Sequence, residues 1–253
     1  MGWLRRMPAL TLVLLVVLPV AADVALPPGV KYKNTPYNGL FTFVRARFTP
    51  TRWGPGNYIW GLDLKWNHDY PRAENHFMKI LKETTALVPN SDGNILALDD
   101  PELFRYPMLY LCEPGFWTLT EKEAQSLRDY LKKGGFLIVD DFIAQHWYNF
   151  ADQIRKVLPD GRLVELDAAH PVFDSFFKVD PSVFNHPNFS YVTPVYYGIF
   201  EDNDPTKRLM VVANYNHDIG EYWEWSDEGF MPIELSNEAY KLGVNYVMYA
   251  MTH

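Results

Sequence analysis

The sequence predicts an α/β protein built around a mainly parallel sheet, and three observations support this prediction. Residues 136–139 form a continuous apolar run, as expected for a strand that is buried on both faces. Residues 120–131 precede it with apolar side chains at helical spacing, and Gly134-Gly135 end that helix. Residues 108–111 form an apolar strand before the helix. A strand, a helix and a strand in this order form a βαβ unit, which builds parallel sheets.

The other elements follow from similar patterns. Thr120 and Glu123 have the spacing of a capping box at the start of the helix just described. Asp69 stands where it can cap an earlier helix whose first turn holds Pro71. Residues 191–200 indicate an irregular strand and loop. Further strands are expected at residues 40–48, 94–98, 162–166 and 209–215, and further helices at residues 144–158 and 236–251.

The N-terminus has the composition of a signal peptide over residues 1–22. Two arginines precede an apolar stretch at residues 9–20, which is shorter than the ~20 residues that a membrane-spanning helix needs. Val20 and Ala22 fit the small-residue pattern before a cleavage site. We therefore expect an exported protein, periplasmic or extracellular, whose mature chain has no transmembrane segment. An uncleaved N-terminal anchor is the alternative.

The composition limits the number of domains and the class of partner. Residues 23–39 predict an extended lead-in, and residues 40–253 predict a single domain. The net charge is −8, and the basic residues are scattered rather than clustered, so a nucleic acid partner is not expected. Cys112 is the only cysteine, so no internal disulfide can form. Its apolar neighbours predict a buried, inert thiol.

Polar side chains follow the predicted strands, which is where ligands bind in open parallel sheets. These residues are Arg45, Arg47, Asp99, Asp100, Glu113, Asp140, Asp141 and 214–218. Asp140 and Asp141 are the strongest candidates, because at least one of two adjacent acids after an apolar strand must be solvated, paired or metal-bound. The simpler interpretation is a helix cap with a solvated neighbour.

A divalent metal is one further interpretation of these acids. Asp141, His146 and Asp218 offer oxygen and imidazole ligands, although their spacing matches no dedicated metal motif. No cofactor is recognised, because the chain lacks a G-x-G-x-x-G fingerprint and a Walker loop. It also lacks a G-x-S-x-G elbow, which disfavours an α/β-hydrolase.

Aromatic residues make up 16% of the chain and include eight tryptophans. Trp60 and Trp66 lie beside a loop rich in glycine, and because such loops seldom serve as core elements, one interpretation is that these residues line a cleft. Packing in the core is the alternative.

Several separated segments occur in an order known from one protein family. They are residues 41–45, Trp66 with residues 69–74, residues 134–141, residues 215–220 with residues 223–225, and residues 242–246. Together they resemble the bacterial domain-of-unknown-function family 4159 over nearly all of residues 40–252.

The resemblance implies a flavodoxin-like, three-layer sandwich similar to class I glutamine amidotransferase-like and ThuA-like domains. In this comparison Asp140 and Asp141 occupy the strand end that carries the cysteine elbow of amidotransferases. Cys112 lies on the preceding strand, so a glutaminase triad is not implied. The family carries no established activity that could be transferred.

Two functions therefore remain open from the sequence, and whether the chain is an enzyme stays undecided. The first is a ligand-binding or interaction domain, for a small molecule, a carbohydrate or a cell-envelope protein. The alternative is a carboxylate- or metal-dependent hydrolase, whose substrate could be a carbohydrate. In that case Asp140, Asp141, Glu113 or Asp218 would act as the general acid or base. The candidate cleft residues are Arg45, Trp66, Asp69, Glu74, Glu113, Asp140, Asp141, Asn216, Asp218 and Trp223.

Overall fold

A seven-stranded sheet with the order β5-β1-β6-β8-β11-β10-β9 forms the centre of the fold. Its strands are β1 (Val44–Arg47), β5 (Asn94–Ala97), β6 (Met108–Cys112), β8 (Phe136–Phe142), β9 (Val164–Glu165), β10 (Val195–Phe200) and β11 (Leu209–Tyr215). β5, β1, β6, β8 and β11 run parallel, whereas β10 pairs antiparallel with both β11 and β9. The predicted α/β class with a mainly parallel sheet is confirmed.

The computed structural model describes residues 34–51, 56–58 and 61–253. These residues fall in one compact unit, Lys31–His253. The expected signal peptide, most of the expected lead-in and Trp60 lie outside the described residues. Two short antiparallel pairs accompany the main sheet, namely β2 (Thr49–Pro50) with β7 (Trp117–Thr118) and β3 (Gly56–Tyr58) with β4 (Gly61–Asp63).

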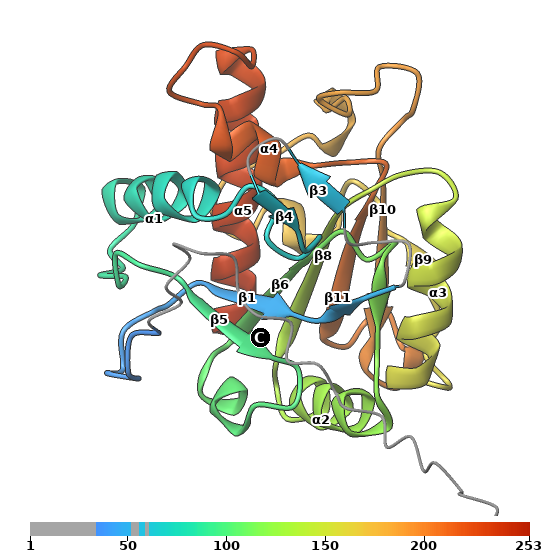
Figure 1. Ribbon diagram of the computed structural model, residues 1–253. Coiled ribbons are helices and arrows are strands. Elements are labelled where there is room, and N and C mark those ends of the chain that lie inside the picture. Colours follow the sequence, from blue (N-terminus) through green and yellow to red (C-terminus); the bar gives the residue numbers. More distant parts are fainter. Residues whose placement is uncertain (1–33, 52–55, 59–60) are drawn as a thin grey trace, which may run out of the picture. The chain divides into compact units, whose positions relative to one another are not determined.

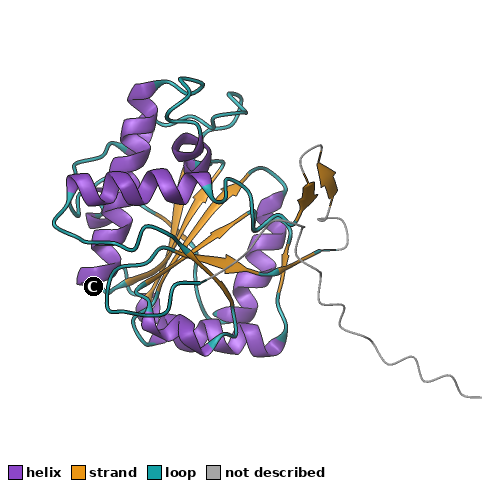
Figure 2. Cartoon of the chain, turned by 60° about the vertical axis from the view of Figure 1, so that its left-hand side comes forward, coloured by secondary structure: helices purple, strands orange, loops and turns teal. Residues whose placement is uncertain are grey.

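Helices cover both faces of the sheet, so the fold has three layers (Figures 1 and 2). One face carries α1 (Arg72–Thr84), α4 (Ile219–Glu224) and α5 (Ile233–Thr252), and the other carries α2 (Glu121–Lys132) and α3 (His146–Val157). Short 3₁₀ helices lie in the connections at η1 (Pro101–Arg105), η2 (Pro171–Phe173), η3 (Pro181–Val183) and η4 (Glu201–Asn203). No helix among the described residues is long and apolar enough to span a membrane.

Alternate side chains of each central strand supply the two apolar cores. Tyr110 and Ile138 belong to the core beneath α1, α4 and α5, whereas Leu109 and Leu137 belong to the core beneath α2 and α3. Each of these side chains is at most 2% exposed, and burying one such apolar side chain stabilises a fold by about 1.5–3 kcal/mol. Burial on both faces explains why the central strands are almost continuously apolar.

Gly243 lets three helices pack closely on one face of the sheet. A Cβ atom at this position of α5 would lie 2.5 Å from Trp223 of α4 and 2.6 Å from Phe77 of α1. The Trp223 and Phe77 rings stack with their centroids 4.5 Å apart. The absence of a side chain at Gly243 therefore sets the positions of α1 and α4, whose N-terminal ends border the site described below.

The sequence predicts side-chain caps at the N-terminal ends of two helices. The Thr120 side chain accepts a hydrogen bond from the backbone N–H of Glu123, and the Glu123 carboxylate accepts one from the backbone N–H of Thr120. This capping box is confirmed. The predicted cap at Asp69 is wrong, because α1 begins at Arg72 after Pro71 and has no side-chain cap. Asp69 has a left-handed backbone, with a φ of 63°, and lies instead in the site at the strand ends.

Two segments near the C-terminus complete the comparison with the sequence predictions. The irregular strand expected within residues 191–200 is β10, which pairs with β11 and shifts register between Ile199 and Phe200. The short helix α4 was not predicted, because its six residues are fewer than two helical turns and show no extended periodicity.

Candidate functional site

Acidic side chains gather at the carboxyl edge of the sheet. They lie near the end of β8 and in the segments after β1, β6 and β11, and the carboxyl ends of these strands meet at one edge because the strands are parallel. The acids are Asp63, Asp69, Glu113, Asp141, Asp218, Glu221 and Glu224. We call this set the edge acids.

Asp140, at the end of β8, is buried and fully hydrogen-bonded. Its Oδ2 accepts from the Tyr110 hydroxyl at 2.8 Å and from the backbone N–H groups of Ile219 and Gly220 at 2.9 and 3.2 Å. Its Oδ1 accepts from the Asn214 amide at 2.9 Å. Burial raises the pKa of Asp140 to about 6, although the hydrogen bonds from Asn214 and Tyr110 lower it. Asp140 therefore joins β8, β6 and the start of α4 and does not face a ligand.

Asp141, the next residue, belongs to a different environment. Potential ligand atoms of Asp69, Asp141 and Asp218 all lie within 4.8 Å of one another. Asp69 and Asp218 come from the connections after β1 and β11, and Asp141 lies near the end of β8, so the fold brings together acids that are up to more than half the chain apart. We call Asp69, Asp141 and Asp218 the acid triad.

Two members of the acid triad hold shielded carboxylates. Asp218 is 4% exposed; its Oδ1 accepts from the backbone N–H of Glu221 at 2.9 Å. Asp69 Oδ2 exposes less than 1 Å² and accepts no hydrogen bond from the described residues. Burial, with the neighbouring charge of Asp141, raises the pKa of both Asp69 and Asp218 well above the usual range. Without a compensating positive charge, burial favours the protonated forms of these two groups.

A second group lies on the other side of Asp141 and contains its own positive charges. His68 Nε2 lies 2.9 Å from Asp63, and His68 Nδ1 lies 3.1 Å from Glu113 and 3.5 Å from Asp141. Burial alone would lower the pKa of His68, but hydrogen bonds to Asp141, Asp63 and Glu113 raise it well above the usual value. Lys65 Nζ adds contacts to Asp63 at 2.8 Å and Glu113 at 3.6 Å. His68 and Lys65 therefore neutralise much of this group.

A third group shares Asp69 with the acid triad and extends onto α4. Ligand atoms of Asp69, Glu221 and Glu224 lie within 4.8 Å of one another. Burial raises the pKa of Glu221 and Glu224, and their own mutual repulsion raises that of Glu224 further. Glu221 accepts a hydrogen bond from the Asn188 amide at 3.1 Å. The segment before β10 is thereby tied to the rim of the site.

Left-handed backbone conformations are concentrated around these groups. Eight described non-glycine residues have a positive φ, and six of them lie at this edge of the sheet. They are Lys65, Asp69, Glu113, Asp141, Ala144 and Asn216. Such conformations cost about 1–3 kcal/mol each when the residue tolerates them poorly, and they cluster where side chains must point in a required direction. The edge acids are thus oriented by the backbone.

A buried ion pair lies beneath the edge acids. Arg45 donates to Glu74 through Nε and, through Nη1, to the Trp66 carbonyl and to Cys112 Sγ at 3.1 Å each. Arg45 is 1% and Glu74 is 2% exposed. Cys112 is completely buried, and burial raises the pKa of its thiol well above the usual value. The thiol is shielded from solvent, as expected for a buried cysteine, and burial favours its protonated form.

Several residues that were predicted to line a cleft have a structural role instead. Trp66 is 2% exposed and Trp223 is 1% exposed, so both pack in the cores and neither lines a cleft. Asn216 bonds to Ala144 and Thr193 and joins two connections. His146 packs against Phe116 with ring centroids 4.8 Å apart and is in none of the three groups.

Other strand-end residues lie outside the edge site. Asp99 pairs with Lys122 at 2.7 Å, Asp100 caps η1, and Arg47 is exposed. Sequence reasoning placed Asp69, Glu113, Asp141 and Asp218 among the candidates. It missed Asp63, Lys65, His68, Glu221 and Glu224. One signal was available for the first three, since charged residues at positions 63, 65, 68 and 69 follow a glycine-rich loop.

Chemically, the arrangement suits a positively charged ligand. Among the residues that the structure describes, the seven edge acids face two cations, Lys65 and His68, both of which contact the acids around Glu113. The acid triad supplies only carboxylate oxygens, which are the ligands that Mg²⁺, Mn²⁺ and Ca²⁺ prefer.

Comparison with known proteins adds a family match. The model of the family described as Domain of unknown function (DUF4159) matches residues 57–251. No curated protein matches the chain. The matched range includes every edge acid.

Proposed function

The chain belongs to the family Domain of unknown function (DUF4159), and on the basis of its edge acids we propose that it is a ligand-binding domain whose ligand carries positive charge. The observation that carries this proposal is the convergence of Asp69, Asp141 and Asp218, with ligand atoms within 4.8 Å of one another. Like charges at this separation repel, and burial adds the cost of removing each carboxylate from water. A bound cation would offset both terms.

The charge balance of the surroundings supports a cationic ligand. Arg45 is bonded to Glu74, and Lys65 and His68 contact Asp63 and Glu113. No lysine or arginine among the described residues forms a salt bridge with Asp69 or Asp218. The acid triad is consequently the part of the site with the largest excess of negative charge.

We further propose that the scaffold is flavodoxin-like and related to amidotransferase-like domains, without their cysteine nucleophile. The five parallel strands supply the support, since their order across the sheet is 2-1-3-4-5 when they are numbered along the chain. Burial of Cys112 and the raised pKa of its thiol argue against nucleophilic use of this residue.

A second candidate function is carboxylate-dependent hydrolysis. The observation in its favour is that Asp69 and Asp218 have raised pKa values while a third carboxylate, Asp141, lies beside them. Neighbouring carboxyl groups of which some have raised pKa values are typical of paired acid–base work. Binding is the simpler proposal, because it needs no reacting group beyond those named.

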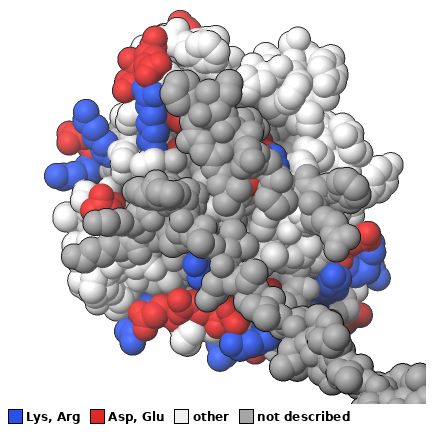
Figure 3. Space-filling view, in the orientation of Figure 1, with Lys and Arg blue, Asp and Glu red and all other residues white. Residues whose placement is uncertain are grey.

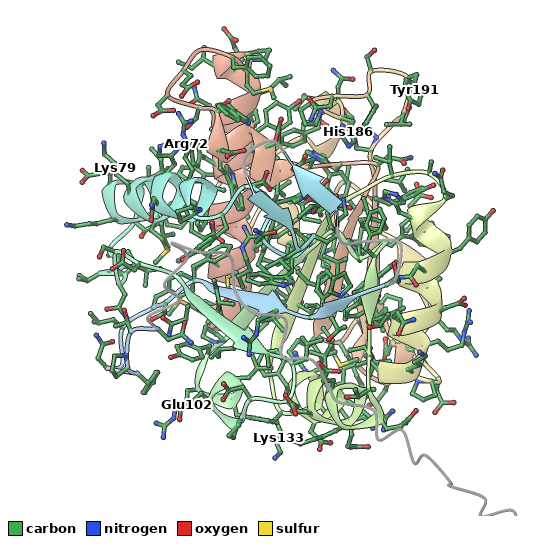
Figure 4. The ribbon with its side chains drawn as sticks, viewed as in Figure 1. Arg72, Lys79, Glu102, Lys133, His186 and Tyr191 are labelled. Atoms are coloured by element: carbon green, nitrogen blue, oxygen red, sulfur yellow. The ribbon has the colours of Figure 1, made fainter. Side chains whose placement is uncertain are left out.

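Export remains part of the proposal and rests on the apolar leader in residues 1–22. The rim of the site offers aromatic side chains to a ligand or an envelope partner. Tyr191 is 78% exposed on the segment before β10, and Figure 4 shows it with His186 in that segment. Figure 3 shows basic and acidic side chains in small groups of both signs on the face it draws. Aromatic rings beside polar groups are typical of carbohydrate and peptide contacts.

A thermal-shift titration tests the proposed function. Ligands that bind only the folded chain raise its Tm, so the full chain should respond to positively charged probes, namely Mg²⁺, Mn²⁺, Ca²⁺, arginine and spermidine. We expect a saturable rise in Tm with at least one probe and none with acetate or phosphate. Asp218→Asn should remove the rise, whereas Asp227→Asn, a change in an exposed acid paired with Arg72, should keep it. A response to the anions alone would contradict the proposal.

A further inference from the structure

We propose that the acid triad of Asp69, Asp141 and Asp218 binds one divalent metal ion with a preference for oxygen ligands, in the class of Mg²⁺, Mn²⁺ and Ca²⁺. This inference rests on the proposed function, because it names the source of the positive charge.

The spacing of the triad is suitable for one ion. Ligand oxygens around an ion bound at ~2.1–2.4 Å are ~3 Å apart when adjacent and ~4–5 Å apart when opposite. The ligand atoms of Asp69, Asp141 and Asp218 lie within 4.8 Å of one another, which is inside that range. Three carboxylates from three connections, completed by water, would fill a six-coordinate shell.

A shielded oxygen atom without a donor points to a missing ligand. Asp69 Oδ2 exposes less than 1 Å² and lacks a donor in the described part of the chain. Asp218 is 4% exposed, and its Oδ1 accepts a hydrogen bond from the backbone N–H of Glu221. Buried polar atoms in folded proteins are almost always bonded, so the Asp69 oxygen requires a partner.

Close packing around Asp69 favours an ion over an organic cation. A Cβ atom at Gly220 would clash with Asp69 Oδ2 and lie 2.8 Å from the Tyr110 hydroxyl. An ammonium or guanidinium group brings a carbon chain that needs its own space, whereas a metal ion needs only its ligands and water. The shielding of Asp69 and Asp218 leaves little such space.

Neighbouring groups orient the three ligands. The backbone N–H of Glu221 holds Asp218, and His68 Nδ1 lies 3.5 Å from Asp141 Oδ2. Left-handed backbone conformations, with φ of 63° and 57°, direct Asp69 and Asp141. Partners of this kind fix ligand orientation in metal sites, and their loss typically lowers metal affinity about 10–100-fold.

The test is a titration of the full chain with Mn²⁺, followed by calorimetry and by the electron paramagnetic resonance signal of free Mn²⁺. We expect binding of one ion per chain. Asp69→Asn, Asp141→Asn and Asp218→Asn should each weaken binding by at least about tenfold, since each removes a charged ligand. Two controls should bind within about threefold of the unchanged chain: Asp227→Asn and Glu102→Gln, which change exposed acids that pair with Arg72 and Arg105. Circular dichroism in chelator establishes that each variant is folded.

Three outcomes would overturn the inference. The first is no saturable Mn²⁺ binding, the second is binding that survives each of the three triad changes, and the third is loss of binding in Asp227→Asn with retention in Asp218→Asn. A Tm rise with arginine or spermidine, without Mn²⁺ binding, would reject the metal while leaving the proposed function standing. The absence of a response to every cationic probe would reject both.

Discussion

Asp140 and Asp141 are adjacent in the chain, but their carboxylates have opposite surroundings. Asp140 accepts hydrogen bonds from two side chains and two backbone N–H groups inside the fold. Asp141, with its left-handed backbone, joins the ligand atoms of Asp69 and Asp218 at the edge of the sheet. One acid of the pair therefore serves stability, and the other is available for a ligand.

The same change at these two positions should consequently have different effects on stability. Asp140→Asn replaces one acceptor oxygen by an amide that faces donors, so we expect it to lower the free energy of unfolding by about 1–3 kcal/mol. Asp141→Asn removes a like charge from the acid triad, so in chelator its free energy of unfolding should equal or exceed that of the unchanged chain. Urea unfolding with EDTA measures both. A larger loss for Asp141→Asn than for Asp140→Asn would refute the assignment.

The buried ion pair beneath the site predicts a non-additive pair of substitutions. Glu74→Gln or Arg45→Met leaves one buried charge without its partner and should cost about 3–5 kcal/mol of unfolding free energy. The double variant Arg45→Met/Glu74→Met leaves no unpaired charge, so it should lose less than the two single variants added together. A double-mutant cycle from urea unfolding gives the coupling, and simple additivity would contradict the ion pair.

His186 predicts a pH-dependent term in stability. Burial lowers the pKa of His186 to about 4, below the value of about 6.5 in an unfolded chain. Between these values the unfolded chain binds a proton that the folded chain does not, so this contribution is complete above about pH 6.5 and is lost as the pH falls toward about 4. His186→Asn keeps an acceptor for the backbone N–H of Asn188 and removes the titration.

The comparison is made on the Tm difference between the His186→Asn variant and the unchanged chain, measured from pH 4 to 7.5. This difference cancels the titration of other groups, including Asp140, whose raised pKa acts in the opposite direction. The variant should gain relative to the unchanged chain as the pH falls. A difference that does not change with pH would show that His186 is not shielded.

Cys112 should resist modification while the chain is folded. Its thiol is fully buried, donates to the Lys65 carbonyl at 3.3 Å and has a raised pKa. Because the thiolate is the reactive form, iodoacetamide at pH 8 should label the folded chain at least about a hundredfold more slowly than the urea-unfolded chain. Mass spectrometry measures the two rates. Rapid labelling of the folded chain would contradict this protection and would make a nucleophilic role of Cys112 compatible with the structure again.

The sequence predicted the central layer of the fold well. The strands β6, β8 and β11 are buried on both faces. Their sequences are therefore continuous apolar runs, which can be recognised from the sequence alone. The capping box of α2 was also predictable, since Thr120 and Glu123 interact with each other across three residues. α4 was not, because a helix of six residues depends on tertiary contacts such as the N–H bonds of Ile219 and Gly220 to Asp140.

The site was predictable only in part. Asp141 and Asp218 follow apolar strands, which marks them as strand-end residues. The approach of Asp69 depends on a left-handed backbone that its spacing does not encode, and the same residue therefore resembled a helix cap. Trp66 and Trp223 were predicted to line a cleft because of their residue type. Both are buried in the cores instead, where a large apolar ring stabilises the fold more than it would at the surface.

Gly243 has a consequence for how the affinity of the site could change. A single methyl group added at Gly243 would clash with both Trp223 and Phe77, which belong to α4 and α1. Asp218 directly precedes α4, and Asp69 lies three residues before α1. A substitution within α5, at a residue that touches no ligand, would therefore move two acids relative to the third. Selectivity among ions of different radius could be retuned from inside the fold, with every ligand residue unchanged.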